Sequence, residues 1–183
     1  MTLRTAVKRK QIHTRKIICH GFLRSDGLWD IEAHLTDTKD HVFASIERGD
    51  LPPGEAIHEM LFRLTLDEKL TIHDAQTETL YSPFSICADV NDWYKLLIGK
   101  QIAPGWNLMV KNLFAGVKGC THLTELLSVM ATTAIQTIYP YLKMQNQQDS
   151  GKFHLSNNLK DTCHGFDTKG KVIARFWPDE IND

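Results

Sequence analysis

The sequence predicts one α+β domain, in which a small antiparallel sheet of two hairpins is packed by three C-terminal helices. Up to about residue 80, apolar and polar side chains alternate with the period of a β-strand. Between about residues 88 and 138, apolar side chains recur instead at helical spacing. The chain has 183 residues, the usual size of one domain, so we expect residues 1–183 to form a single domain.

The first hairpin is expected over residues 15–38, with its turn at Ser25-Asp26-Gly27. Four side chains of its second arm are apolar and share one face: Trp29, Ile31, Ala33 and Leu35. The polar residues that alternate with them share the other face: Asp30, Glu32, His34 and Thr36. Residues 39–55 are expected to be irregular. The second hairpin has expected arms at about 58–66 and 70–77, and its alternation is typical of a sheet covered on one side only.

Three helices are expected next. The first covers about residues 88–98 and ends at Gly99, and the second runs from about Pro104 to Gly116. The longest begins near Cys120 and is expected to end at Pro140. Residues 143–152 are polar and resemble a linker, and Val172 to Trp177 is expected to form a strand.

The net charge of −1 gives no support for nucleic-acid binding. No apolar run reaches about 18 residues, so we expect no membrane span. No export signal is recognisable, so the cysteines are expected to be reduced thiols in the cytoplasm. Residues 1–14 are expected to be a flexible basic tail, with contact to an acidic partner as the alternative. Several basic residues near the start precede the first acidic residue, among them Arg4, Lys8, Arg9, Lys10, Arg15 and Lys16.

Two cysteines stand at expected helix starts. Cys120 opens the longest helix with His122 close behind it, and Cys87 directly precedes the helix of residues 88–98. A helix N-terminus stabilises negative charge on sulfur, which makes a cysteine a better nucleophile and a better metal ligand. The alternative is that each cysteine only fills space at its helix start.

Other candidates for chemistry are less clustered. Asp30, Glu32 and His34 lie on one strand face and could bind a metal or perform acid–base work, although a solvent-facing strand is also polar. His58 begins the second hairpin and is either structural or a ligand. Cys163-His164 is a further pair of side chains of the kinds that bind transition metals, and the sequence assigns it no role.

Three segments resemble an uncharacterised bacterial family that is catalogued only as a domain of unknown function. They are the run DGLWDIEAHL at residues 26–35, the run GCTHLTELL at residues 119–127, and Ala131-Thr132-Thr133-Ala134. The resemblance spans roughly residues 12–177. It implies an intracellular bacterial protein of similar size and supplies no activity.

Residues 56–138 also resemble the NifU/IscU-type iron–sulfur scaffold proteins. The second hairpin with Ile72-His73-Asp74-Ala75, and the run Leu97-Ile98-Gly99-Lys100, match patterns of that family. The resemblance implies that Cys87 and Cys120 correspond to two of the three scaffold cysteines. Where the third is expected, this chain has Ala56-Ile57-His58.

The leading hypothesis is therefore an IscU-like accessory protein that binds zinc, iron or an iron–sulfur cluster. Its metal ligands would be Cys87 and Cys120, completed by His58 or His122. One alternative is an enzyme that uses Cys120 as nucleophile or a pocket of Asp30, Glu32 and His34. Another is a module that binds an apolar small ligand among the tryptophans Trp29, Trp93, Trp106 and Trp177. The sequence leaves open whether the protein binds a protein partner and whether it forms a homo-oligomer.

Overall fold

The computed structural model describes residues 3–146 and 160–178, and its centre is a four-stranded antiparallel sheet in the order β1-β2-β5-β6. The strands are β1 (His13–Leu23), β2 (Trp29–Lys39), β5 (Ala56–Leu66) and β6 (Ile72–Tyr81). They form the two expected hairpins, β1-β2 and β5-β6, and both turns lie where the sequence predicts them. The predicted α+β class is confirmed.

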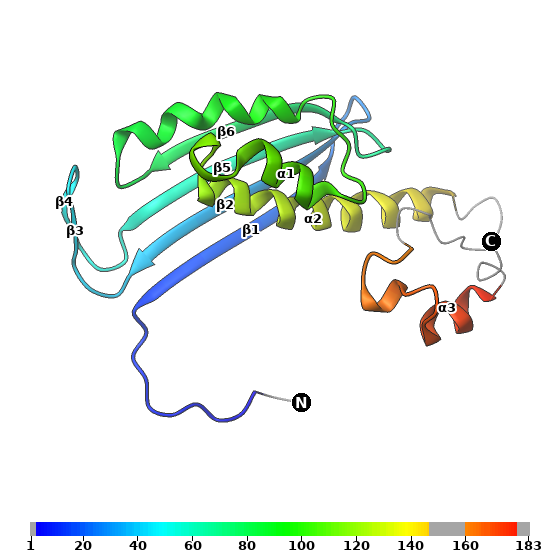
Figure 1. The fold of residues 1–183 in the computed structure, drawn as a ribbon, viewed down its shortest axis with the longest axis horizontal. Helices are drawn as coiled ribbons and strands as arrows, with labels where there is room; N and C mark the ends of the chain where they lie inside the picture. Colours follow the sequence, from blue (N-terminus) through cyan, green and yellow to red (C-terminus); the bar gives the residue numbers. More distant parts are fainter. Residues whose placement is uncertain (1–2, 147–159, 179–183) are drawn as a thin grey trace.

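Helices cover one face of this sheet and leave the other open (Figure 1). The 3₁₀ helix η1 (Ser85–Leu97) lies along β6, and α1 (Trp106–Phe114) packs on α2 (Thr121–Asn146), which crosses β1, β2 and β5. The core lies between these two layers. Its sheet side is built from alternate residues of β2 and β5: Trp29, Ile31, Ala33, Leu35, Met60, Phe62, Leu64 and Leu66.

The structure corrects several sequence predictions in this region. Residues 39–55, expected to be irregular, contain a two-stranded sheet of β3 (Phe43–Ser45) and β4 (Gly49–Leu51). Strands of three residues are too short to show a periodic pattern. The helix expected at 88–98 begins at Ser85, so Cys87 lies in its first turn rather than before it.

Pro140 does not end the long helix, which continues to Asn146. A proline inside a helix removes one backbone hydrogen bond and costs about 3 kcal/mol. The residues around it offset that cost by packing: Tyr139, Tyr141 and Leu142 lie against the core, and the Tyr141 ring meets Trp29 edge-on at 5.1 Å. The rest of the predicted linker, residues 147–152, lies outside the described residues.

Residues 172–177, expected to form a strand, belong instead to the short helix α3 (Lys171–Phe176) and its end. A strand needs a neighbouring strand for its backbone hydrogen bonds, whereas a helical turn satisfies them internally. Trp177 N–H donates to Ile173 O at 2.8 Å. At the other end of the chain, residues 3–12 are exposed and precede β1.

Candidate metal centre

Three polar residues lie side by side across the sheet, on the face that packs against α2. Arg15 of β1 is the cross-strand partner of Asp37 of β2, and Asp37 is the partner of His58 of β5. The neighbouring row on the same face is apolar: Ile17, Leu35 and Met60. The polar row therefore marks the end of the core.

The first turn of α2 brings His122 over this row. Asp37 is 1% exposed, and its Oδ2 lies 3.3 Å from His58 Nδ1 and 3.5 Å from His122 Nε2. The two imidazole rings stack with their centroids 3.8 Å apart. One ligand atom from each of Asp37, His58 and His122 lies within 4.8 Å of the others.

These separations suit a bound metal ion. Adjacent ligand atoms around a tetrahedral zinc with bonds of about 2.05 Å lie about 3.3–3.4 Å apart. The distances from His58 Nδ1 and His122 Nε2 to Asp37 Oδ2 are close to that spacing. In addition, His58 Nδ1 is buried and makes no hydrogen bond in the described part of the chain. A buried nitrogen that makes no hydrogen bond is costly unless it serves another purpose, such as ligation.

The protonation states also suit ligation. Burial and the neighbouring His122 lower the pKa of His58 to about 4, and burial together with Arg15 lowers the pKa of His122. Burial alone would raise the pKa of Asp37, but the Arg15 hydrogen bonds lower it overall. At neutral pH the site therefore holds two neutral imidazoles and one carboxylate, which are the forms that bind metals.

Arg15 fixes the carboxylate from the opposite side. Its Nε and Nη2 donate to the two oxygens of Asp37 at 2.8 and 2.7 Å, and its Nη1 donates to Glu125 of α2. His13 Nε2 lies 3.2 Å from Asp37 Oδ1. The guanidinium is a fixed positive charge that compensates the buried carboxylate when no other cation is present.

Cys120 lies next to this group and outside it. Its Sγ is 3.8 Å from His122 Nδ1, the ring nitrogen that faces away from Asp37. The Tyr94 hydroxyl holds the backbone at this point, accepting from Cys120 N–H and contacting Cys120 O, both at 3.0 Å. Cys120 thus contacts the second nitrogen of a candidate ligand, a position from which it orients the ring.

The family model described as "Protein of unknown function (DUF2889)" matches residues 13–136, which is more than half of the chain. The chain belongs to the DUF2889 family. The matched segment contains Asp37, His58, Cys120 and His122. No curated protein and no solved structure matches the chain. The expected membership of a family of unknown function is confirmed over residues 13–136, and the IscU-like arrangement stays an expectation.

The structure of this DUF2889 domain separates the predicted metal ligands. His58 and His122 meet at Asp37, but Cys87 on η1 belongs to no group of candidate ligands in residues 3–146 and 160–178. Cys19 lies on β1 with its pKa raised by burial. Cys163 is exposed and directly precedes the short turn of His164–Phe166.

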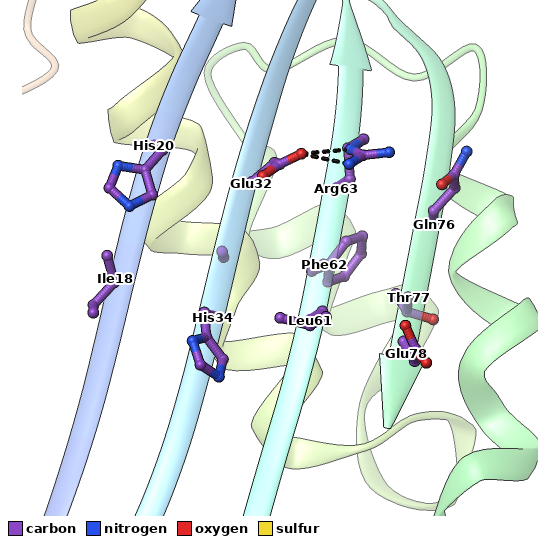
Figure 2. A pocket seen from close by; sticks show the side chains of 11 residues that line it. Ile18, His20, Glu32, His34, Leu61, Phe62, Arg63, Gln76, Thr77 and Glu78 are labelled. Carbon is purple, nitrogen blue, oxygen red and sulfur yellow. Dashed lines mark hydrogen bonds and ion pairs between the residues drawn. The ribbon is translucent and has the colours of Figure 1, made fainter. Parts of the chain in front are cut away.

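Asp30, Glu32 and His34 alternate with the buried residues of β2 and so lie on the open face of the sheet. Figure 2 shows Glu32 and His34 on this face. Each is paired with a neighbour rather than with the other two. Glu32 accepts from Arg63 at 2.7 Å, His34 contacts Glu59 at 2.8 Å, and Asp30 accepts from Thr65. Glu32 and His34 border a hollow on this face, and Asp30 also pairs with Arg24 at 3.3 Å.

Two residues of the centre, Asp37 and Arg15, are absent from the sequence prediction. The signal for Asp37 is its position, since it continues the alternate residues Trp29 to Leu35 and so falls on the buried face. Arg15 enters the sequence prediction only as one of the basic residues near the start of the chain. A charged residue on the apolar face of a strand is the pattern that would have found both. In the described part of the DUF2889 chain, no helix is long and apolar enough to cross a membrane.

Proposed function

We propose that this protein binds one divalent metal ion through Asp37, His58 and His122. The observation that carries the proposal is the convergence of two histidine nitrogens on one carboxylate oxygen of Asp37. One of these nitrogens, His58 Nδ1, is buried and makes no hydrogen bond among the described residues. The ligands come from β2, β5 and α2, so the folded sheet and helix together create the site.

The donor set favours zinc or iron(II). Two imidazoles and a carboxylate are typical of catalytic zinc and of mononuclear iron(II) sites, whereas iron–sulfur clusters are held mainly by cysteine thiolates. None of the three grouped residues is a cysteine. The side chains of His58 and His122 are 18% and 21% exposed, so part of each ring reaches solvent although Asp37 is buried.

Three protein ligands leave a coordination position for water or a substrate atom, which distinguishes catalytic from closed structural sites. Asp37, His58 and His122 would hold the ion, and a zinc ion there would supply Lewis-acid chemistry. The protein's own residues prepare the ligands: Cys120 contacts the outer nitrogen of His122, and Arg15 compensates the buried Asp37 carboxylate when no ion is bound.

The test is metal binding by the purified protein. We expect about one zinc or iron per chain, and a visible spectrum of low-symmetry cobalt(II) after substitution. His58→Ala and His122→Ala should each weaken zinc binding at least tenfold. Mutating even the residues that only orient metal ligands typically lowers metal affinity by about 10–100-fold. His34→Ala is the matched control, because this histidine lies on the opposite face of the same sheet. Equal zinc affinity in all three variants contradicts the proposal.

A second candidate function uses the thiol of Cys120 as a nucleophile. The specific observation is the line from Cys120 Sγ to His122 Nδ1 at 3.8 Å and from His122 Nε2 to Asp37 at 3.5 Å. A cysteine, a histidine and an orienting carboxylate form the arrangement used in nucleophilic catalysis. Iodoacetamide labelling followed by peptide mass spectrometry tests it. Cys120 should react faster than the exposed Cys163, and His122→Ala should remove the difference. Slower labelling of Cys120 excludes this candidate.

A further inference from the structure

The open face of the four-stranded sheet combines exposed apolar side chains with charged ones. Ile18, Phe22 and Leu61 lie on this face and are 36–48% exposed. Ile18 and Leu61 border the same hollow, which has a volume of about 370 Å³ and extends from β1 to β6 (Figure 2). Apolar side chains that are grouped and surrounded by polar residues are typical of a surface that binds another protein.

Cross-strand register arranges the residues of the open face in rows that run from β1 to β6. One central row is His20, Glu32, Arg63 and Gln76, and the row beside it is Ile18, His34, Leu61 and Glu78. In the first of these rows the Glu32 carboxylate accepts from Arg63 Nε at 2.7 Å. The centre of the face therefore presents one acidic and one basic group side by side.

The two edge strands carry opposite charges on this face. Strand β1 contributes Lys16 and His20, whereas β6 contributes Asp74 and Glu78. Lys16 and Glu78 are exposed, and neither has an ion-pair partner within residues 3–146 and 160–178. The open face thus changes from basic at β1 to acidic at β6.

A second copy of the chain complements this face when a two-fold axis runs along the strands, between β2 and β5. Such an axis turns the sheet over and places β1 over β6 and β2 over β5 at the same level. Arg63 then faces Glu32 of the second copy, and the reverse, which gives a ring of alternating charges. Glu78 comes within two residues of the level of Lys16 of the second copy.

The other two-fold axis compatible with aligned sheets runs across the strands. It would place β1 over β1 and β6 over β6, so that the acidic edges of the two copies would meet. Like charges brought together in an interface cost several kcal/mol. The distribution of charge on the face therefore selects the axis along the strands.

The size of the face also suits a stable dimer. Its four strands have 10 or 11 residues each. They cover about 35 Å by 19 Å, or roughly 650 Å². Stable interfaces bury about 600–1,000 Å² on each partner. Packed sheets lie about 10 Å apart, a gap that an extended lysine and a glutamate bridge together.

We propose that the protein forms a symmetric homodimer in which the open faces of two sheets pack together, with β1 of each copy over β6 of the other. The interface is separate from the proposed metal centre, since Asp37, His58 and His122 lie at the face that packs against α2.

Zero-length cross-linking of the full-length protein tests the arrangement. A carbodiimide joins a lysine amine directly to a carboxylate, and peptide mass spectrometry of a mixture of isotopically light and heavy protein identifies links between two chains. We expect a link from Lys16 to Glu78 in the dimer. Within one chain these residues lie on opposite edges of the sheet, separated by about 14 Å across the strands and a further 7 Å along them, too far for a direct amide. A cross-linked dimer without this link overturns the arrangement.

Analytical ultracentrifugation of charge variants provides the second test. Lys16→Glu and Glu78→Lys should each weaken dimerisation by about tenfold or more, because each places like charges together twice in a symmetric dimer. The double variant should recover most of the loss, since it restores opposite charges. A double variant that is weaker than both single variants overturns the pairing of β1 with β6.

The apolar centre is tested with Leu61→Asp, which should abolish the dimer. Leu96→Asp is the matched control, because Leu96 is 57% exposed on η1 and does not lie on the sheet. Thermal melting verifies that both variants are folded. A protein that stays monomeric up to millimolar concentration, or a dimer that persists in Leu61→Asp, overturns the proposal. His58→Ala should still dimerise, which separates this result from any failure of the metal proposal.

Discussion

The side chain of Asp37 is both charged and buried. A carboxylate that is 1% exposed is expensive to bury unless it is compensated. Arg15 compensates it with two short hydrogen bonds, and the histidines His58 and His122 approach from the remaining side. A divalent ion would share the carboxylate with the guanidinium, so Arg15 affects both the stability of the metal-free protein and its metal affinity.

Replacing Arg15 by methionine tests this role. The metal-free variant should lose about 2 kcal/mol or more of unfolding free energy, because Asp37 loses two charge-assisted hydrogen bonds. Its zinc affinity should rise, because a nearby positive charge that repels the ion is removed. Urea unfolding in a chelator and zinc competition with an indicator dye measure the two effects.

Arg63→Met provides the matched control. Arg63 pairs with Glu32 on the open face, where both side chains are more than a third exposed, so its loss should cost at most about 1 kcal/mol. A decrease in zinc affinity in Arg15→Met would contradict the role given to the guanidinium.

Among the elements, the turn between β5 and β6 depends on one carboxylate. Asp67 Oδ1 accepts from Lys69 N and Thr71 N, both at 2.9 Å, and Oδ2 lies 3.1 Å from His73 Nε2. Within this turn Leu70 has φ of 63°, a left-handed conformation that costs about 1–2 kcal/mol, while its side chain is buried. The hydrogen bonds of Asp67 offset that strain.

Asp67→Ala should therefore destabilise the protein by about 1 kcal/mol at pH 7. Burial alone would raise the pKa of Asp67, but the hydrogen bonds from Thr71, His73 and Lys69 lower it overall. A carboxyl with a lowered pKa contributes stability above its unfolded pKa of about 3.9, and this is lost as pH falls through the folded value. Urea unfolding at pH 7 and pH 3 should show the difference between the two proteins shrinking at the lower pH. A constant difference would contradict the assignment.

The contact between β1 and α2 depends on Gly21. A Cβ built on this glycine overlaps the side chain of Thr137, so strand and helix approach more closely than any other residue permits. Gly21→Ala should cost about 1–3 kcal/mol, the usual cost of overpacking. Combining it with Thr137→Ala should recover part of the loss, since the two nearest atoms are removed. Equal losses in the single Gly21 variant and the double variant would show that the contact is not the cause.

In the whole molecule, the proposed ligands join the sheet to the helical layer. Because β2, β5 and α2 each supply one ligand, only the folded chain presents all three together. A ligand that binds only the folded state stabilises it by mass action.

Zinc at about 100 times its dissociation constant should raise the unfolding free energy by about 2.7 kcal/mol. For a protein of this size, that corresponds to a rise in melting temperature of roughly 5–10 °C. Calorimetric melting with zinc and with a chelator measures it. His34→Ala should retain the shift and His58→Ala should lose it. A shift that persists in His58→Ala would place the zinc elsewhere.

The sequence by itself determined the hairpins, their turns and the main helices, because these follow from local periodicity and turn residues. Short strands, the continuation of α2 through Pro140 and the helical nature of Lys171–Phe176 depended on packing and pairing, which local patterns do not encode. His58 and His122 were predicted as metal ligands, but together with Cys87 and Cys120 rather than with Asp37. Only the tertiary structure decided that they meet at Asp37. Cross-strand register brings His58 to Asp37, which lies 21 positions earlier in the chain, and the docking of α2 adds His122, which lies 64 positions after His58.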